Sequence, residues 1–179
     1  MLPAFETERL FLRPRTMADI DACMAMDRDP EVTKYVPGPW HNPQEHRRFV
    51  ISRIEAEFAP GLGYWSIFAK AQPELFLGWV LLIPDNAIGP DIEIGWRLNR
   101  HAWGKGYATE AARPLVDHAF LFLGIERVVA SIHPDNAASI HVAKKIGLRP
   151  ERDTIHDETP YQTYAINRVD FLSSQALNT

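Results

Sequence analysis

Apolar side chains recur along this chain with two different spacings, and each spacing predicts a different element. Between residues 107 and 123 they return at steps of three and four, which is typical of one buried face of a helix. The positions of that face are Ala108, Ala111, Ala112, Leu115, Val116, Ala119, Phe120 and Leu123. Between residues 91 and 97 apolar and polar side chains alternate instead, which predicts a strand. Its two faces carry Ile92, Ile94 and Trp96 on one side and Asp91, Glu93, Gly95 and Arg97 on the other.

The same patterns, separated by turn-forming prolines and glycines, predict a mixed α+β order along the whole chain. The predicted strands are residues 10–13, 64–69, 76–82, 92–98, 127–132, 148–155 and 161–170. The predicted helices are residues 17–27, 43–58, 107–123 and 137–145, with Thr16 and Asn42 as N-caps of the first two. The N-terminal half of the sequence favours antiparallel strands, and the C-terminal half favours a βαβαβ succession. No linker or repeat divides the chain, so we expect one domain over residues 1–179.

The helix predicted at residues 107–123 follows directly after two glycines that flank a lysine, in the run Trp103-Gly104-Lys105-Gly106-Tyr107-Ala108-Thr109-Glu110. Glycine permits close approach and positive φ angles, and a helix start presents free N–H groups with partial positive charge. Together these features favour the binding of phosphate or pyrophosphate. The spacing does not match a nucleotide P-loop, and Thr109 stands where a dinucleotide fingerprint requires a third glycine. A turn that enters a helix without any ligand is the alternative.

Composition narrows the class of protein further. With 179 residues and a net charge of −4, the chain is long enough for a sizeable core and lacks the basic surface typical of nucleic-acid binding. Its one cysteine, Cys23, stands among Met17, Ile20 and Met24 at helical spacing, which predicts a core thiol and not a nucleophile. The seven histidines show no metal-ligand spacing, so we expect no metal. Neither a signal-type nor a membrane-spanning apolar run occurs, so we expect a cytoplasmic protein.

Four groups of residues, taken in order, resemble the GNAT superfamily of acetyl-CoA-dependent N-acetyltransferases. They are Glu6-Thr7-Glu8-Arg9-Leu10 with Leu12-Arg13-Pro14, then Glu93-Ile94-Gly95-Trp96, then the glycine loop, and finally Asn136, Ser139, Lys145, Gly147 and Leu148. The branch that they resemble most includes the ribosomal-protein N-terminal acetyltransferases. The resemblance implies a mostly antiparallel sheet of six or seven strands, splayed in the middle and flanked by about four helices.

Carried over residue by residue, the resemblance implies a binding site for acetyl-CoA, with coenzyme A as product. Backbone N–H groups of the glycine loop would hold the pyrophosphate, backbone groups near Trp96 and Leu98 would pair with the pantetheine amides, and Asn136 would bind the pantetheine arm. Arg100 and Lys105 are cations beside the loop, with solvated surface charge as their alternative role. The implied coenzyme-binding residues are Trp96, Leu98, Arg100, Trp103, Gly104, Lys105, Gly106, Tyr107, Ala108, Thr109, Asn136 and Ser139.

Attack of an amine on a thioester needs a neutral amine and a proton for the departing thiolate. Glu93 resembles the carboxylate that many family members carry on this strand, which makes it the candidate base. Many members place a tyrosine acid seven residues after the asparagine, but Ala143 stands there. The pattern of the branch that the chain resembles implies that Ser139, one helical turn after Asn136, hydrogen-bonds or protonates the sulfur. A surface carboxylate and a helix serine without a ligand are the alternatives.

The acceptor amine is left open by the sequence. Free α-amines titrate near 7.7–8.0 and lysine near 10.4, so deprotonating lysine costs about 3–4 kcal/mol more at neutral pH. That difference favours the N-terminus of a protein or peptide, with a small molecule such as an aminoglycoside, polyamine or amino acid as the alternative. A non-catalytic acyl-CoA-binding module is a further alternative. The family implies an acceptor groove at Tyr35, Trp40, His41, Tyr161 and Tyr164, although ordinary packing explains each ring equally well. It also implies a monomer or homodimer. From the net charge and the lack of a long apolar run we expect neither nucleic acid nor a membrane as a partner.

Overall fold

The computed structural model describes residues 2–85, 89–156 and 158–176, and the chain divides into two compact units. The first comprises Met1–Leu81 and Trp96–Ala111, and the second comprises Leu82–Gly95 and Ala112–Thr179. Three elements run through both units because the chain passes from one to the other within them. They are strand β4 (Gln72–Pro84), strand β5 (Ile92–Leu98) and helix α3 (Tyr107–Asp117).

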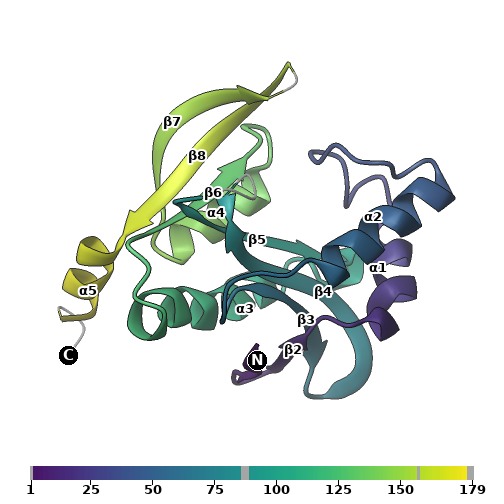
Figure 1. The fold of residues 1–179 in the computed structure, drawn as a ribbon, viewed down its shortest axis with the longest axis horizontal. Helices are drawn as coiled ribbons and strands as arrows, with labels where there is room; N and C mark the ends of the chain where they lie inside the picture. Colours follow the sequence, from purple (N-terminus) through teal and green to yellow (C-terminus); the bar gives the residue numbers. More distant parts are fainter. Residues whose placement is uncertain (1, 86–88, 157, 177–179) are drawn as a thin grey trace. The chain divides into compact units, whose positions relative to one another are not determined.

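The first unit holds the antiparallel strands β1 (Phe5–Glu6), β2 (Leu10–Pro14) and β3 (Gly63–Ala69), next to which β4 and β5 follow in that order. Helices α1 (Ile20–Asp27) and α2 (Pro43–Glu55) lie side by side in Figure 1. Their apolar faces close a core of Ile20, Cys23, Met24, Met26, Val50 and Phe76.

Local sequence signals explain where these helices begin. Thr16 and Asp19 form the reciprocal bonds of a capping box in front of the short 3₁₀ turn Met17–Asp19, which leads into α1. The side chain of Asn42 accepts from the backbone N–H groups of Gln44 and Glu45, so it caps α2 as predicted. Cys23 is buried, and this burial raises the pKa of its thiol to about 11. The prediction of a core thiol is therefore confirmed.

Gly78 allows β4 and β5 to approach closely within the first unit. A Cβ atom at this position, where φ is +147°, would lie 2.1 Å from the carbonyl oxygen of Arg97 and 2.7 Å from the Cα of Leu98. Two hydrogen bonds fix the strands there, from Asn99 N to Leu77 O at 2.8 Å and from Asn99 Nδ2 to Phe76 O at 3.0 Å. Only a residue without a side chain fits between the two backbones.

The second unit continues the sheet with β6 (Arg127–Ile132), β8 (Thr159–Asn167) and β7 (Arg149–His156), so that β7 is the edge strand. β5 and β6 are parallel, with Ile92 opposite Val128 and Glu93 opposite Val129, whereas β8 is antiparallel to both of its neighbours. Figure 1 shows β7 and β8 as a long hairpin followed by α5 (Arg168–Ala176). Helix α4 (Ala137–Lys145) precedes this hairpin, and a π-helical turn (His118–Phe122) continues α3.

The fold is the predicted α+β class, with a mostly antiparallel sheet of eight strands and five helices in the described residues. Several predicted boundaries were wrong, and the strand predicted at residues 76–82 is longer at both ends, since β4 spans Gln72–Pro84. The second helix ends at Glu55, three residues before the predicted end, and Arg168, Val169 and Asp170 begin α5 where the last strand was expected to continue. The ring of Phe171 in α5 stacks on Phe120 at 4.8 Å, a tertiary contact that no local pattern encodes. The prediction of one domain over residues 1–179 stays a prediction.

None of the helices in the described part of the chain combines the length and apolar character required to cross a lipid bilayer.

Candidate active site

The glycine loop presents a continuous row of backbone donors in the first unit. Gly104 and Gly106 have φ angles of +71° and +79°, which side chains rarely adopt. Among the described residues, the N–H groups of residues 104–109 have no hydrogen-bond acceptor, and the first α-helical bond here runs from Glu110 N to Gly106 O at 3.0 Å. A Cβ at Gly104 would meet nothing within 4 Å, so the space before the loop is open. These donors fit a pyrophosphate group.

Glu110 ties this loop to the N-terminal strands. Its carboxylate accepts from Thr7 Oγ1 at 2.6 Å, from Arg9 N at 2.8 Å and from Arg9 Nε at 2.7 Å. The Arg9 guanidinium also lies over the Tyr107 ring, 4.7 Å from its centroid. Burial alone would raise the pKa of Glu110, but the hydrogen bonds from Thr7 and Arg9 outweigh it and lower that pKa. The Glu6-Thr7-Glu8-Arg9-Leu10 motif thus has a positioning role that the sequence did not reveal.

The two predicted cations beside the loop differ in their surroundings. Arg100 forms an ion pair with Asp29, with Nε 2.8 Å from Oδ2, and hydrogen bonding to Arg100 lowers the pKa of Asp29. Lys105 is exposed and has no ion-pair partner among the described residues. Trp103 is 46% exposed, and its Nε1 donates to the Leu98 carbonyl at 2.9 Å. Lys105 is therefore the cation that is available to a phosphate without breaking an existing pair.

The predicted catalytic residues lie in the second unit. Glu93 is half-buried on β5, opposite Val129 of β6. Asn136 caps α4 by accepting from Ser139 N at 3.1 Å, which confirms the capping role for this asparagine. The hydroxyl of half-buried Ser139 has no hydrogen-bond partner among the described residues, so it is available to a ligand.

The β7–β8 hairpin lines a cavity of about 700 Å³ that includes one of the predicted acceptor residues. The lining residues are Pro134, Asp153, Thr154, Ile155, Pro160, Tyr161 and Gln162. The Tyr161 ring meets His133 and His156 edge-on, at 6.4 and 6.3 Å between centroids. Tyr164 is 2% exposed and donates its hydroxyl hydrogen to Gln162 at 2.7 Å, so it contacts a lining residue of the cavity.

The remaining acceptor candidates lie in the first unit. His41 is exposed, half-buried Tyr35 has Lys34 Nζ 5.5 Å from its ring centroid, and Trp40 donates from Nε1 to the Val36 carbonyl at 2.8 Å. Trp40 stacks edge-on against His46, with 5.3 Å between ring centroids. Tyr35, Trp40 and His41 therefore all lie in the loop between α1 and α2, and His46 of α2 packs against Trp40.

Sequence reasoning missed a buried cluster that links this loop to β5. Asp27 accepts from Arg97 Nη1 at 2.7 Å, and its other oxygen lies 3.2 Å from His46 Nε2. The Arg97 guanidinium lies 5.0 Å from the ring centroids of both Trp40 and Trp79. The alternation of apolar and polar residues along β5 predicted that Arg97 shares a face with Glu93. That was the only sign of this cluster in the sequence.

This arrangement can be compared with known proteins. The family model described as the acetyltransferase (GNAT) domain matches residues 9–149. The chain belongs to the GNAT family. It is accordingly an acetyl-CoA-dependent N-acetyltransferase, and the alternative of a non-catalytic module falls away. The comparisons do not name the ribosomal-protein branch.

Individual relatives agree with this assignment. The chain is 31% identical over 148 residues to the uncharacterized N-acetyltransferase p20 of Bacillus licheniformis, covering 81% of this chain and 82% of that one. It is 32% identical over 171 residues to the FsC-acetyl coenzyme A-N(2)-transacetylase of Aspergillus fumigatus, covering 90% and 69%. A crystal structure of a GNAT-family acetyltransferase from Bacillus anthracis superposes with a TM-score of 0.79 at 26% identity, covering 93% and 99%.

Proposed function

We propose that this GNAT enzyme acetylates the α-amine of a protein or peptide N-terminus. The observation that carries this proposal is the cavity beside the β7–β8 hairpin, whose volume of about 700 Å³ lies in the range of ligand sites. β7 is an edge strand, so its free backbone groups can pair with an extended peptide while the cavity receives the peptide's end. The lower pKa of α-amines adds to this, because the enzyme then needs only a modest base.

In this proposal the open N–H groups of residues 104–109 and the exposed Lys105 hold the coenzyme pyrophosphate. Trp96 and Leu98 present backbone groups to the pantetheine arm, and Asn136 contacts that arm while it caps α4. When bound, acetyl-CoA supplies the thioester carbonyl that the amine attacks. Arg100 contributes little, because Asp29 already engages its guanidinium and offsets its charge.

Glu93 and Ser139 carry the proton transfers. The Glu93 carboxylate takes a proton from the amine, directly or through a water molecule, so that nitrogen can form its bond to the carbonyl carbon. As the carbon–sulfur bond breaks, the Ser139 hydroxyl donates a proton or hydrogen bond to the thiolate. Ala143 leaves the position of the usual tyrosine acid without a hydroxyl, which supports Ser139 in this role.

The test measures thiol release from acetyl-CoA with N-terminal peptides, lysine peptides, polyamines and aminoglycosides as acceptors. We expect release with N-terminal peptides. Release confined to a small-molecule class would replace this proposal with the alternative of a small-molecule acetyltransferase, which the relative named for FsC keeps open.

We predict that Glu93→Gln lowers kcat with the preferred acceptor by about 10²-fold or more, because general-base catalysis contributes that much. Coenzyme A affinity should stay unchanged. The matched control is Glu126→Gln, which neutralises an exposed carboxylate of the same unit. An unaltered pH–rate profile in the Glu93 variant would exclude it as the base.

A further inference from the structure

One guanidinium in the second unit donates hydrogen bonds to side chains from three different parts of the sheet. Arg127 is the first residue of β6, and its Nε donates to Oδ2 of Asp91, the residue before β5, at 3.0 Å. Its Nη1 donates to Asn167 Oδ1 of β8 at 3.3 Å, and its Nη2 donates to Glu151 of β7. The strands lie in the order β5, β6, β8 and β7, which can be followed in Figure 1. A single side chain therefore ties four neighbouring strands together.

A β-bulge in β7 contributes one of these partners. Pro150 and Arg152 pair with consecutive residues of β8, so Glu151 is the extra residue between them. Bulges redirect a side chain and are frequent beside active sites. Hydrogen bonding to Arg127 lowers the pKa of Glu151, so its carboxylate is ionised at neutral pH. The irregularity in β7 thus coincides with a charged partner for Arg127.

The ladder between β5 and β6 is short where this network meets it. In the part of the chain that the structure describes, the two parallel strands share two pairs, and Glu93 opposite Val129 is the second of them. β5 continues beyond Glu93, so this residue stands where the two strands separate. Continuing the register back by one position from the first pair brings Asp91 beside Arg127, and their side chains are in fact bonded. The ion pair therefore reinforces the ladder at the end next to Glu93.

The network is also close to Glu93 along the strand. Asp91 and Glu93 are two residues apart, so their side chains share a face of the sheet at a spacing of about 7 Å. The side chains of Arg127 and Asp91 are only 23% and 26% exposed, so water screens this pair less than a pair on the open surface. Any shift of Asp91 displaces Glu93 with it. A misplacement of about 1 Å can lower a reaction rate by about 10²-fold.

We propose that Arg127 is a positioning residue for the reaction, which holds β5 at Asp91 so that the Glu93 carboxylate meets the amine. The inference rests on the proposed role of Glu93 as general base, and it adds Glu151 and Asn167 as the supports of Arg127. Each nitrogen of the guanidinium already donates to a side chain, so Arg127 acts through β5 and not by contact with the substrate. Its loss should lower kcat and leave the acceptor KM and the coenzyme A affinity unchanged.

The first experiment measures kcat and KM by thiol release for Arg127→Met, with whichever acceptor of the panel the wild type prefers. Methionine keeps an apolar stem and removes all three bonds. We expect kcat to fall by about tenfold or more, as for a displaced catalytic group. The matched control is Arg149→Met, at an exposed arginine of β7 that has no ion-pair partner among the described residues, and it should leave kcat unchanged.

Combination with Glu93→Gln tests whether Arg127 acts through the base. The effects of two changes on the same catalytic group are not additive, whereas independent effects multiply. Arg127→Met in the Glu93→Gln background should therefore leave kcat at the value of Glu93→Gln alone. An equal fold loss in both backgrounds would overturn the inference, because Arg127 would then support the fold or another group. The assignment of Glu93 as base would stand in that case.

Arg127→Lys is the second variant and keeps the experiment decisive if Arg127→Met does not fold, which urea unfolding checks. Lysine keeps the positive charge but lacks the planar fork that reaches three partners at once. We expect its kcat to lie between those of the wild type and Arg127→Met, with the same lack of additivity toward Glu93→Gln. A wild-type kcat in both Arg127 variants would overturn the inference.

Hydrogen exchange provides a measurement that does not depend on catalysis. The amides of β5 around Glu93 should exchange faster in Arg127→Met than in the wild type or in Arg149→Met, because the short ladder loses its reinforcement. Unchanged exchange would overturn the inference. If exchange accelerates but Glu93→Gln has a normal kcat, the proposed base is wrong and the catalytic role of Arg127 falls with it, whereas its hold on β5 remains.

Discussion

At the scale of single residues, the glycine loop is where sequence and chemistry correspond most directly. Both glycines adopt positive φ angles, and residues 104–109 present their N–H groups without acceptors among the described residues. The sequence predicted this cradle because its two requirements, backbone freedom and a helix start, are local. It could not predict the clamp of Thr7 and Arg9 on Glu110, because those partners lie about a hundred positions away along the chain.

We predict that Gly106→Val weakens coenzyme A binding by at least tenfold. The new Cβ would lie at an ordinary contact distance of 3.5 Å from Arg9 Nη2, but a β-branched residue is strained at a φ of +79°. The loop therefore has to rearrange, and its N–H groups turn away. Calorimetric titration with coenzyme A measures the effect. The matched control is Gly124→Val, which carries similar strain at a φ of +66° with open space around it. Retained affinity in the Gly106 variant would contradict the role of the loop.

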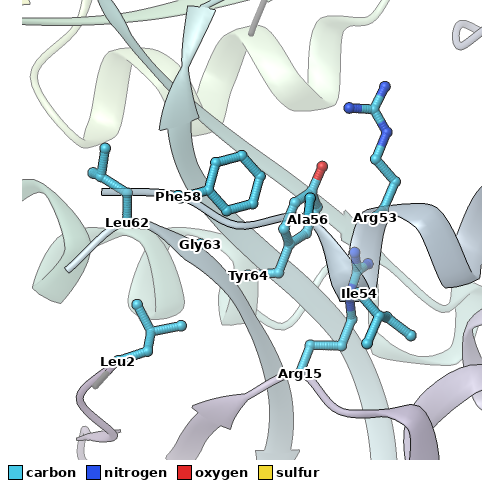
Figure 2. Close-up of a pocket in the computed structure, with 9 residues that line it drawn as sticks. All are labelled: Leu2, Arg15, Arg53, Ile54, Ala56, Phe58, Leu62, Gly63 and Tyr64. Carbon is cyan, nitrogen blue, oxygen red and sulfur yellow. The ribbon is translucent and has the colours of Figure 1, made fainter. Parts of the chain in front are cut away.

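At the scale of elements, prediction succeeded where local periodicity decided the structure. The strands at residues 92–98 and 127–132 and the helix at 137–145 have the predicted bounds. Buried Ala111 and Leu115 in α3 and buried Phe120 in the π-helical turn after it confirm the predicted apolar face. It failed at residues 168–170, where Phe171 packs on Phe120 and the chain turns into α5. It also missed Arg15, whose guanidinium lies against the rings of Tyr64 (Figure 2) and Trp79, because no local motif encodes that contact.

We predict that Gly78→Ala lowers the free energy of unfolding by about 2–4 kcal/mol, since overpacking against backbone cannot be relieved by a rotamer change. The methyl group would lie 2.1 Å from the Arg97 carbonyl oxygen, so β5 has to move away from β4. Coenzyme affinity should fall as well, because Trp96 and Leu98 are displaced with the strand. Urea unfolding compared with Gly124→Ala separates this steric effect from the cost of a positive φ alone.

At the scale of the whole molecule, each unit holds a carboxyl group with a shifted pKa, and the two shifts have opposite directions. In the first, hydrogen bonds from Thr7 and Arg9 lower the pKa of Glu110 despite its partial burial. In the second, burial raises the pKa of Asp117, and Arg113 offsets this only in part. A lowered carboxyl pKa stabilises the folded state at neutral pH, whereas a raised one destabilises it there. Stability against pH can therefore distinguish the two groups.

We predict that Glu110→Gln lowers stability at neutral pH and that this difference shrinks in acid. The folded pKa of Glu110 lies below its unfolded value, so its contribution is fully present above the unfolded value of about 4.3 and is lost as pH falls through the folded pKa. Asp117→Asn should raise stability at neutral pH. Its advantage should vanish as pH falls through the raised folded pKa, where the native carboxyl is itself neutral. Urea unfolding of the three proteins between pH 3 and 8 measures both differences. Parallel curves for wild type and Glu110→Gln would show that the Thr7 and Arg9 contacts do not favour the ionised carboxylate, and the clamp would then position the loop by shape alone.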